Sequence, residues 1–212
     1  MAAPALRCTA PPCGIAKGER IGVRGDTGSG KSTLLDLLMG LIEPTHGEIR
    51  VDGRKLDADA RRAWQANIAH VPQSIYMIDD SIAANVTLGI PPEKIDRARL
   101  AAAVQVAQLE DVIAQLPEGY DTIVGERGIR VSGGQRQRIG LARALYREAS
   151  ILVLDEATSA LDPRTEARVI AGIMSLPQNT TIVIVSHRES ALNLCDRRID
   201  VTDGALDHPP QT

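Results

Sequence analysis

Glycines followed by a lysine and a serine form the first group whose types and spacing could do chemistry. The pattern G-x-x-x-x-G-K-[ST] is matched by Gly25-Asp26-Thr27-Gly28-Ser29-Gly30-Lys31-Ser32, which lies between an apolar stretch and a helical pattern. The glycines let the backbone curl so that successive N–H groups point inward, and the helix start adds its positive dipole end. We predict that this loop, with Thr33 after it, binds the phosphates of a nucleotide. Lys31 would reach the β- and γ-phosphates, and the Ser32 hydroxyl would hold Mg²⁺. A flexible glycine turn is the alternative interpretation.

Two carboxylates form the second group. Asp155-Glu156 follows the apolar stretch Ile151 to Leu154, and a buried strand presents charge only at its exposed carboxyl end, where ligands of open α/β sheets bind. We expect Asp155 to hold Mg²⁺ through water and Glu156 to polarise an attacking water as general base. Alone, this pattern is more typical of a solvated strand end. Together with the phosphate loop, it predicts a catalytic site.

The elements that must position these groups alternate along the chain. Short apolar strands are expected at 21–23, 70–71, 151–154 and 181–185, and helices from Lys31 onward, at 135–147 and at 164–174. In the first helix, Leu34, Leu35, Leu38 and Leu41 share one face. Strands that are apolar on both faces and alternate with helices indicate an α/β fold, with a mostly parallel sheet flanked by helices.

A central block without strand signals interrupts this alternation. Between residues 82 and 116 the chain is rich in alanine with helical spacing, broken only at Pro91-Pro92. We therefore predict a single domain with an inserted helical subdomain. The α/β core would span about 14–73 and 148–204, the helical subdomain about 74–147, and a loose tail 205–212.

Composition excludes several classes of function. The formal net charge is −3, which gives no general attraction to nucleic acid or to an anionic membrane surface. Cys8, Cys13 and Cys195 lack the spacing of metal ligands and are expected to be reduced thiols. No apolar stretch approaches the roughly 20 residues needed to span a bilayer. Any membrane association is expected to go through a protein partner.

The stretch Val131-Ser132-Gly133-Gly134-Gln135 indicates the family. It resembles the Leu-Ser-Gly-Gly-Gln signature of ATP-binding cassette (ABC) proteins, with Val in place of Leu, and the following Arg136-Gln137-Arg138 is also typical of them. The resemblance implies a RecA-like P-loop NTPase fold and bound ATP with Mg²⁺. It also implies a head-to-tail dimer, in which the signature of one chain faces the γ-phosphate held by the other.

Further landmarks of that family occur in the expected order. Gln73 resembles the glutamine that contacts Mg²⁺ or water and senses a transmembrane partner, and Ser159-Ala160-Leu161-Asp162 resembles the loop that meets the opposite subunit. His187 resembles the switch histidine that contacts the γ-phosphate. A lone histidine at this place would more often be structural, but its position in the series favours the catalytic interpretation.

Two short segments are similar to those of exporter-type cassettes: Gly125-Glu126-Arg127-Gly128 and Asp79-Asp80-Ser81-Ile82. This resemblance implies ATP hydrolysis that powers export. The partners would be a transmembrane domain and a second nucleotide-binding domain, identical or different, and nucleic acid would not be one. The expected location is the cytoplasmic face of the inner membrane. Lipid, oligosaccharide and peptide exporters fit equally well.

The chain departs from the family ahead of the phosphate loop. Cassettes of this kind carry two more strands there and an aromatic residue that stacks on adenine, whereas no aromatic residue precedes Gly25; Trp64 and Tyr76 come nearest without matching. Loss of stacking worth ~1–3 kcal/mol would weaken ATP binding roughly tenfold to a hundredfold. A shortened cassette with weak or no ATPase activity is therefore one alternative. A non-transport ABC ATPase is another, although the long coiled-coil insertion or tandem cassette usual there is missing.

Overall fold

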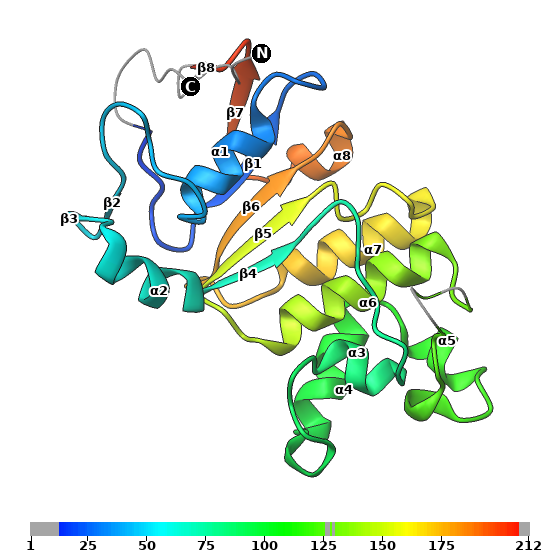
Figure 1. Ribbon diagram of the computed structural model, residues 1–212. Coiled ribbons are helices and arrows are strands. Elements are labelled where there is room, and N and C mark those ends of the chain that lie inside the picture. The colour runs from blue at the N-terminus through cyan, green and yellow to red at the C-terminus, as the bar shows by residue number, and fades with distance from the viewer. Residues whose placement is uncertain (1–12, 126–127, 129, 208–212) are drawn as a thin grey trace. The chain divides into compact units, whose positions relative to one another are not determined.

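The computed structural model describes residues 13–125, 128 and 130–207 (Figure 1). Within these residues the chain forms two compact units. The first contains residues 13–69, 149–155 and 178–207, and the second contains the remaining described residues between 70 and 177. Each unit is described separately.

A six-stranded sheet with the strand order β4-β5-β6-β1-β7-β8 is the centre of the first unit. Its strands are β1 (Arg20–Arg24), β4 (Ile68–Val71), β5 (Ile151–Asp155), β6 (Thr181–Val185), β7 (Arg197–Thr202) and β8 (Ala205–Asp207). Strands β5, β6, β1 and β7 pair in parallel, and β8 runs antiparallel to β7. The last two residues of β4 belong to the second unit. The mostly parallel α/β sheet predicted from the sequence is confirmed.

Aliphatic side chains fill the core around this sheet, as expected of a chain without Phe. All five residues of β6 are buried, so its unbroken apolar sequence is explained by cover on both faces. Burying one such side chain contributes about 1.5–3 kcal/mol. The core residues are Ile21, Val23, Leu35, Met39, Ile68, Val153, Val183, Val185, Ile199, Val201 and Leu206.

The other elements of the first unit are α1 (Lys31–Leu38), β2 (Arg50–Val51), β3 (Arg54–Lys55), α2 (Ala58–Ala66) and α8 (Glu189–Leu192). Helix α1 ends earlier than its apolar spacing predicts. Gly40 adopts a left-handed φ of 66°, and the Leu41 N–H donates to the Asp36 carbonyl oxygen at 2.8 Å, the arrangement of a Schellman cap. The expectation that Leu41 shares one helix face with Leu34, Leu35 and Leu38 was therefore wrong, because Leu41 lies beyond the cap and is 56% exposed.

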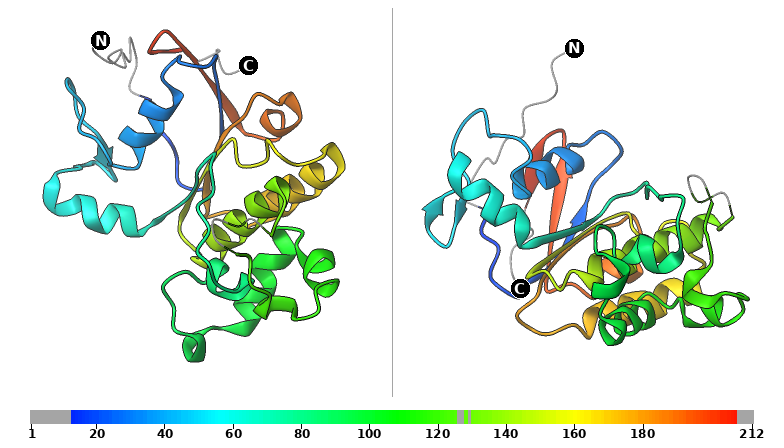
Figure 2. Two further views of the ribbon diagram at one scale, coloured as in Figure 1. Left: turned by 45° about the vertical axis from the view of Figure 1, so that its right-hand side comes forward. Right: turned by 60° about the horizontal axis from the view of Figure 1, so that its bottom comes forward.

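Helices make up the second unit: α3 (Ile82–Val86), α4 (Arg97–Val106), α5 (Glu110–Ala114), α6 (Gly133–Tyr146) and α7 (Pro163–Met174), with 3-10 turns η1 (Pro92–Lys94) and η2 (Gly119–Asp121). Helices α3 and α4 both pack on α6 (Figure 2). We expected residues 156–177 to belong to the α/β core, but they group with the helices. Helix α7 contacts α4, where a Cβ on Gly172 would lie 3.3 Å from Val106 Cγ1.

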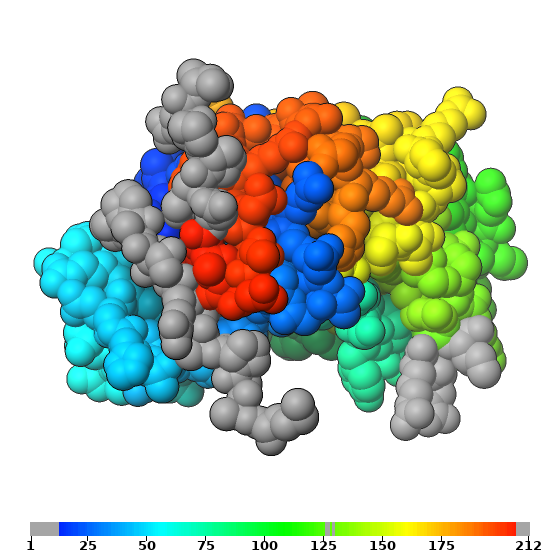
Figure 3. Space-filling model, turned by 90° about the horizontal axis from the view of Figure 1, so that it is seen from above, coloured from blue at the N-terminus to red at the C-terminus, as the bar shows by residue number. Residues whose placement is uncertain are grey.

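The C-terminal strands are a second difference from the expected boundaries. Residues 205–207, expected to begin a loose tail, form β8 because Leu206 is buried opposite Val201 of β7. Figure 3 shows these red strands beside the blue N-terminal segment, in agreement with the pairing of β7 with β1. Across the described parts of the chain, every helix is too short or too polar to cross a membrane.

Candidate functional site

The loop between β1 and α1 has a backbone that only glycine allows at several positions. Gly28 and Gly30 have φ values of 83° and 110°, which L side chains rarely adopt. A Cβ on Gly25 would lie 2.4 Å from the Val201 carbonyl oxygen and 2.5 Å from Ser29 Oγ. The turn after β7 supports the loop, since the Gly204 N–H donates to the Ser29 carbonyl oxygen at 2.8 Å.

Lys31, the first residue of α1, lies folded over this loop. Its Nζ donates to the carbonyl oxygens of Gly25 at 2.7 Å and Asp26 at 2.8 Å, and the residue is only 8% exposed. A buried ammonium needs such partners. The two carbonyl oxygens satisfy hydrogen bonds of the ammonium group, but they carry no formal negative charge. The positive charge of Lys31 is therefore not neutralised by these two contacts, and it favours the binding of an anion at the loop.

Donor groups at the start of α1 fit phosphate oxygens. Gly30 caps the helix without a side-chain hydrogen bond, and the first turn of the helix contains no acidic residue, so the first turn itself supplies no negative charge to the positive end of the helix. The Ser29 hydroxyl is buried and has no hydrogen-bond partner among the described residues. Ser32 and Thr33 follow in the first turn. Amide groups, an ammonium group and an unsatisfied hydroxyl together suit an oligophosphate.

The register of the sheet brings Asp155 and His187 to the same edge as this loop. Val23 of β1 is the partner of Val185 in β6, and Val185 is also the partner of Asp155 in β5. Because these strands are parallel and adjacent, the residues that follow them emerge at one carboxyl edge, where α/β sheets bind ligands. The phosphate loop, the first carboxylate and the predicted switch histidine therefore share one edge of the first unit.

The donors available for Mg²⁺ do not form a dedicated cage. The described residues contain no group of three His, Cys, Asp or Glu side chains that could hold a metal ion. Mg²⁺ is ordinarily bound by one or two protein oxygens together with phosphates and water. A serine hydroxyl at Ser32 and a carboxylate at Asp155 fit that use, in which the nucleotide brings most of the ligands.

Within the second unit, Gln73 contacts the predicted general base directly. Gln73 Nε2 donates to Glu156 Oε2 at 2.9 Å, which fixes the direction in which the carboxylate points. Glu156 has a φ of 49°, the left-handed region that residues other than glycine seldom adopt, which is common at active sites. The structure thus brings together two catalytic candidates that lie far apart in the sequence.

The predicted signature residues start helix α6. Ser132 caps it: Ser132 Oγ accepts from the Gln135 N–H at 3.2 Å, while Gln135 Oε1 accepts from the Ser132 N–H at 2.8 Å. This reciprocal pair is a capping box. A Cβ on Gly134 would lie 3.1 Å from the Ala160 carbonyl oxygen, which explains a small residue there. A Cβ on Gly133 would meet nothing closer than Ala160 Cβ at 3.8 Å.

Neighbouring motif segments contact the same helices. Asp162 caps α7, and hydrogen bonds from Thr165 and then Arg164 hold the pKa of its carboxyl below the usual value. Gly128 packs closely on Met77 and Arg136. Glu126 and Arg127, the middle of the predicted exporter-type loop, lie outside the described residues.

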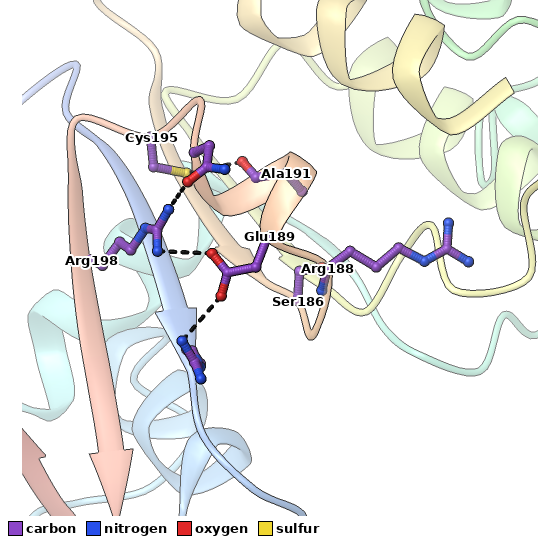
Figure 4. A network of polar contacts seen from close by, with 8 residues as sticks. Ser186, Arg188, Glu189, Ala191, Cys195 and Arg198 are labelled. Carbon is purple, nitrogen blue, oxygen red and sulfur yellow. Dashed lines mark hydrogen bonds and ion pairs between the residues drawn. The ribbon is translucent and has the colours of Figure 1, made fainter. Parts of the chain in front are cut away.

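The segment after His187 is attached to the sheet by Glu189, which sequence reasoning missed. Glu189 at the start of α8 pairs with Arg24 of β1 at 3.0 Å and with Arg198 of β7 at 2.9 Å (Figure 4). The Arg188 N–H donates to Ser186 Oγ at 3.0 Å, and the Arg188 side chain points away from Glu189 in Figure 4. An acidic residue soon after the histidine was the available signal, but its partners come from distant strands.

The two units divide the predicted site residues between them. Gly25 to Thr33, Asp155 and His187 lie in the first unit, and Gln73, Glu156 and Ser132 to Gln135 lie in the second. The roles given to these residues remain predictions.

Known proteins resemble the chain over most of its length. The family described as ABC transporter matches residues 12–159. Proteins named ATP-dependent lipid A-core flippase from Cupriavidus metallidurans and Burkholderia orbicola are each 44% identical over 192 residues, covering 90% and 91% of this chain. The chain spans 32% of the length of each of these relatives.

A solved structure gives the same result for the fold. The structure of a bacterial Atm1-family ABC exporter with ATP bound has a TM-score of 0.84 and 36% sequence identity to this chain. The match covers 90% of this chain and 33% of the exporter chain. It corresponds to the nucleotide-binding portion of that exporter.

Proposed function

Because this chain belongs to the ABC transporter family, we propose that it binds ATP with Mg²⁺ and hydrolyses the ATP to power export across a membrane. The observation that carries the proposal is the contact between Gln73 and Glu156, at 2.9 Å. A general base must be positioned to reach its proton, and the amide N–H of Gln73 fixes the orientation of the Glu156 carboxylate.

The phosphate loop would bind and neutralise the nucleotide. Lys31 would exchange the carbonyl oxygens of Gly25 and Asp26 for phosphate oxygens, a stronger interaction because it joins opposite charges. The Ser32 hydroxyl and Asp155 would hold Mg²⁺, directly or through water. The chemistry that Mg²⁺ would supply there is neutralisation of the charge that develops on the phosphate oxygens.

His187 and Glu156 would act at the reacting phosphate. Glu156 would accept a proton from the attacking water, and His187 would contact the γ-phosphate from the sheet edge that it shares with the loop. Positioning and charge stabilisation supply most of the catalysis in phosphoryl transfer. The ion pairs of Glu189 with Arg24 and Arg198 would help to hold the segment that carries His187 against the sheet.

A second nucleotide-binding domain and a transmembrane domain are the proposed partners. Ser132 to Gln135 lie at a helix start, which is suited to an anion, but this chain has its own phosphate loop. We infer that these residues complete the site of a second chain arranged head to tail. The exporter names and the exporter match among similar proteins support a transmembrane partner. With that partner, the chain would lie at the cytoplasmic face of the inner membrane.

Relatives named lipid A-core flippase favour a lipid-linked saccharide as cargo. This extension is narrower than the ATPase proposal, because substrate contacts would lie in membrane segments outside the portion matched here. It predicts that such a lipid stimulates ATP hydrolysis by the transporter that contains this chain, whereas a peptide of similar charge does not.

The test of the ATPase proposal measures phosphate release by the purified chain with Mg-ATP. Glu156→Gln is expected to lower the rate by at least roughly 100-fold, the usual contribution of a general base, while ATP binding persists. Lys31→Met is expected to abolish binding. Glu118→Gln changes an exposed glutamate of the second unit and serves as the matched control. Equal rates for Glu156→Gln and the wild type would refute the assignment, and binding without turnover in the wild type would favour the weak-cassette alternative.

A further inference from the structure

Gln137 is a buried polar residue of α6 for which the proposed function gives no role. It is 6% exposed, and its side-chain amide contacts three residues of the segment that follows β5. Its Oε1 accepts from the Ala160 N–H at 2.8 Å, and its Nε2 donates to Ser159 Oγ at 2.9 Å and to the Glu156 carbonyl oxygen at 3.4 Å. The oxygen and the nitrogen of this buried amide therefore both form hydrogen bonds with the segment that begins at Glu156, the predicted general base.

That segment has a backbone that needs such support. Glu156 is held at a φ of 49°, and the turn that follows closes through the Ser159 N–H, which donates to the Glu156 carbonyl oxygen at 3.1 Å. A left-handed residue other than glycine persists only where its surroundings fix it. A single residue whose amide reaches Glu156, Ser159 and Ala160 is well placed to do so.

Gln137 lies on the same helix, α6, that the signature residues begin. Ser132 caps α6 and Gln137 lies little more than one turn further along, so the two move together with the rigid start of the helix. Gly134 lies between them, in close approach to the Ala160 carbonyl oxygen. A displacement of the helix start would therefore be passed to Ala160 by Gln137 and by this close packing.

We propose that Gln137 is a positioning residue that fixes the orientation of Glu156 and couples it to the signature end of α6. Since the signature would engage the nucleotide of the partner chain and Glu156 the chain's own nucleotide, Gln137 would link the two ATP sites. This inference rests on the proposed function for its catalytic meaning. Its structural part, that Gln137 holds the 156–160 turn, stands without it.

Hydrogen exchange tests the structural part without any hydrolysis. Gln137→Leu removes the acceptor of the Ala160 N–H, and that amide is expected to exchange roughly tenfold faster, while the amides in the middle of α6 keep their rates. Gln105→Leu, at an exposed position of α4, is the control and should leave Ala160 unchanged. Unaltered exchange at Ala160 in Gln137→Leu would overturn the proposal, whether or not the chain hydrolyses ATP.

Kinetics test the coupling to Glu156. Gln137→Leu is expected to lower kcat by about tenfold to a hundredfold, with the Kd for ATP changed by less than about twofold. In the Glu156→Gln background, Gln137→Leu should cause no further loss, because two residues that act through one group are not additive. An equal fold-loss in both backgrounds, or a loss confined to ATP binding, would refute a positioning role.

A second variant guards against a folding defect. Gln137→Glu keeps an acceptor for the Ala160 N–H and removes the donor to the Glu156 carbonyl oxygen. It should exchange at Ala160 close to the wild-type rate and show an intermediate kcat. Faster exchange than in Gln137→Leu would contradict the assignment of Oε1 as the supporting atom. If the wild type and Glu156→Gln release phosphate equally, the ATPase proposal fails separately, and exchange at Ala160 still decides the role of Gln137.

Discussion

Gly140→Ala tests the packing that places the Gln73 segment on the signature helix. A Cβ at position 140 would lie 2.5 Å from Ile75 Cδ1, 2.8 Å from Cγ1 and 3.0 Å from Cγ2, so the whole Ile75 side chain would have to move. Ala is more favourable than Gly in a helix by about 1 kcal/mol. Overpacking a filled core costs about 1–3 kcal/mol. The expected net change is therefore a destabilisation of up to about 2 kcal/mol.

Thermal unfolding followed by circular dichroism measures this difference. At this chain length, about 1 kcal/mol lowers Tm by roughly 2–4 °C. Ile75→Val removes the nearest atom, Cδ1, and in combination with Gly140→Ala should lose less stability than the two single changes together. Gly133→Ala is the control, since a Cβ there meets nothing closer than 3.8 Å, and its stability should be unchanged or slightly higher.

The reasoning would be refuted if Gly140→Ala raised the free energy of unfolding by about 1 kcal/mol, the full difference in helix propensity between Ala and Gly. Such a gain would mean that Ile75 does not fill the space beside α6. If the losses of stability caused by Gly140→Ala and Ile75→Val simply added in the double variant, the proposed contact between these two positions would also be contradicted. Because Ile75 lies two residues after Gln73, we also expect Gly140→Ala to lower the hydrolysis rate more than it lowers ATP binding.

Three further predictions concern single side chains. Asn85 is fully buried and its amide donates to the Ile78 carbonyl oxygen at 3.0 Å, so Asn85→Leu should lower the free energy of unfolding by about 2–4 kcal/mol in chemical denaturation. Burial raises the pKa of Cys195 to about 11; peptide-resolved alkylation at pH 9 should be slower there than in the unfolded chain, and stability should fall as pH rises from about 9 to 11, because the unfolded thiol ionises first. Rapid alkylation of folded Cys195 at pH 9 would contradict that burial. Ser132→Ala removes the cap of α6 and should cost about 1 kcal/mol in thermal unfolding, whereas no loss would show that the capping box contributes nothing.

Much of the sheet could be predicted because its central strands are apolar without interruption. Strand β6 has the predicted bounds, β1 is one residue longer than predicted at each end, and β5 is one residue longer at its carboxyl end. Strand β7 was missed because Arg197, Arg198 and Asp200 interrupt it, although Ile199 and Val201 alternate toward the core. Helix α2 was missed because its sequence carries only Ala and one Trp as apolar residues. Trp64 packs on the core and donates from Nε1 to the Leu38 carbonyl oxygen at 2.8 Å, which only tertiary contact reveals.

In the candidate site, too, features set by neighbouring residues could be predicted from the sequence, and contacts between distant residues could not. The phosphate loop could be found because glycine spacing is a local requirement of its backbone. The contact of Gln73 with Glu156, the left-handed backbone of Glu156 and the amide of Gln137 depend on side chains from separate elements. Spacing along the chain carries no signal for such contacts. Glu189 was missed for the same reason, since Arg24 and Arg198 come from two different strands.

The solution mass of Glu156→Gln, measured by light scattering with and without Mg-ATP, tests the central claim most directly. Calorimetry on the same sample establishes whether ATP is bound. Removing the general base while keeping the phosphate loop and the signature should trap two chains around uncleaved nucleotide, so the mass should double with Mg-ATP alone. Adding Ser132→Arg should keep the chain monomeric while ATP still binds. A sample saturated with ATP that stays monomeric, or that dimerises equally without nucleotide, would contradict a composite site shared between two chains.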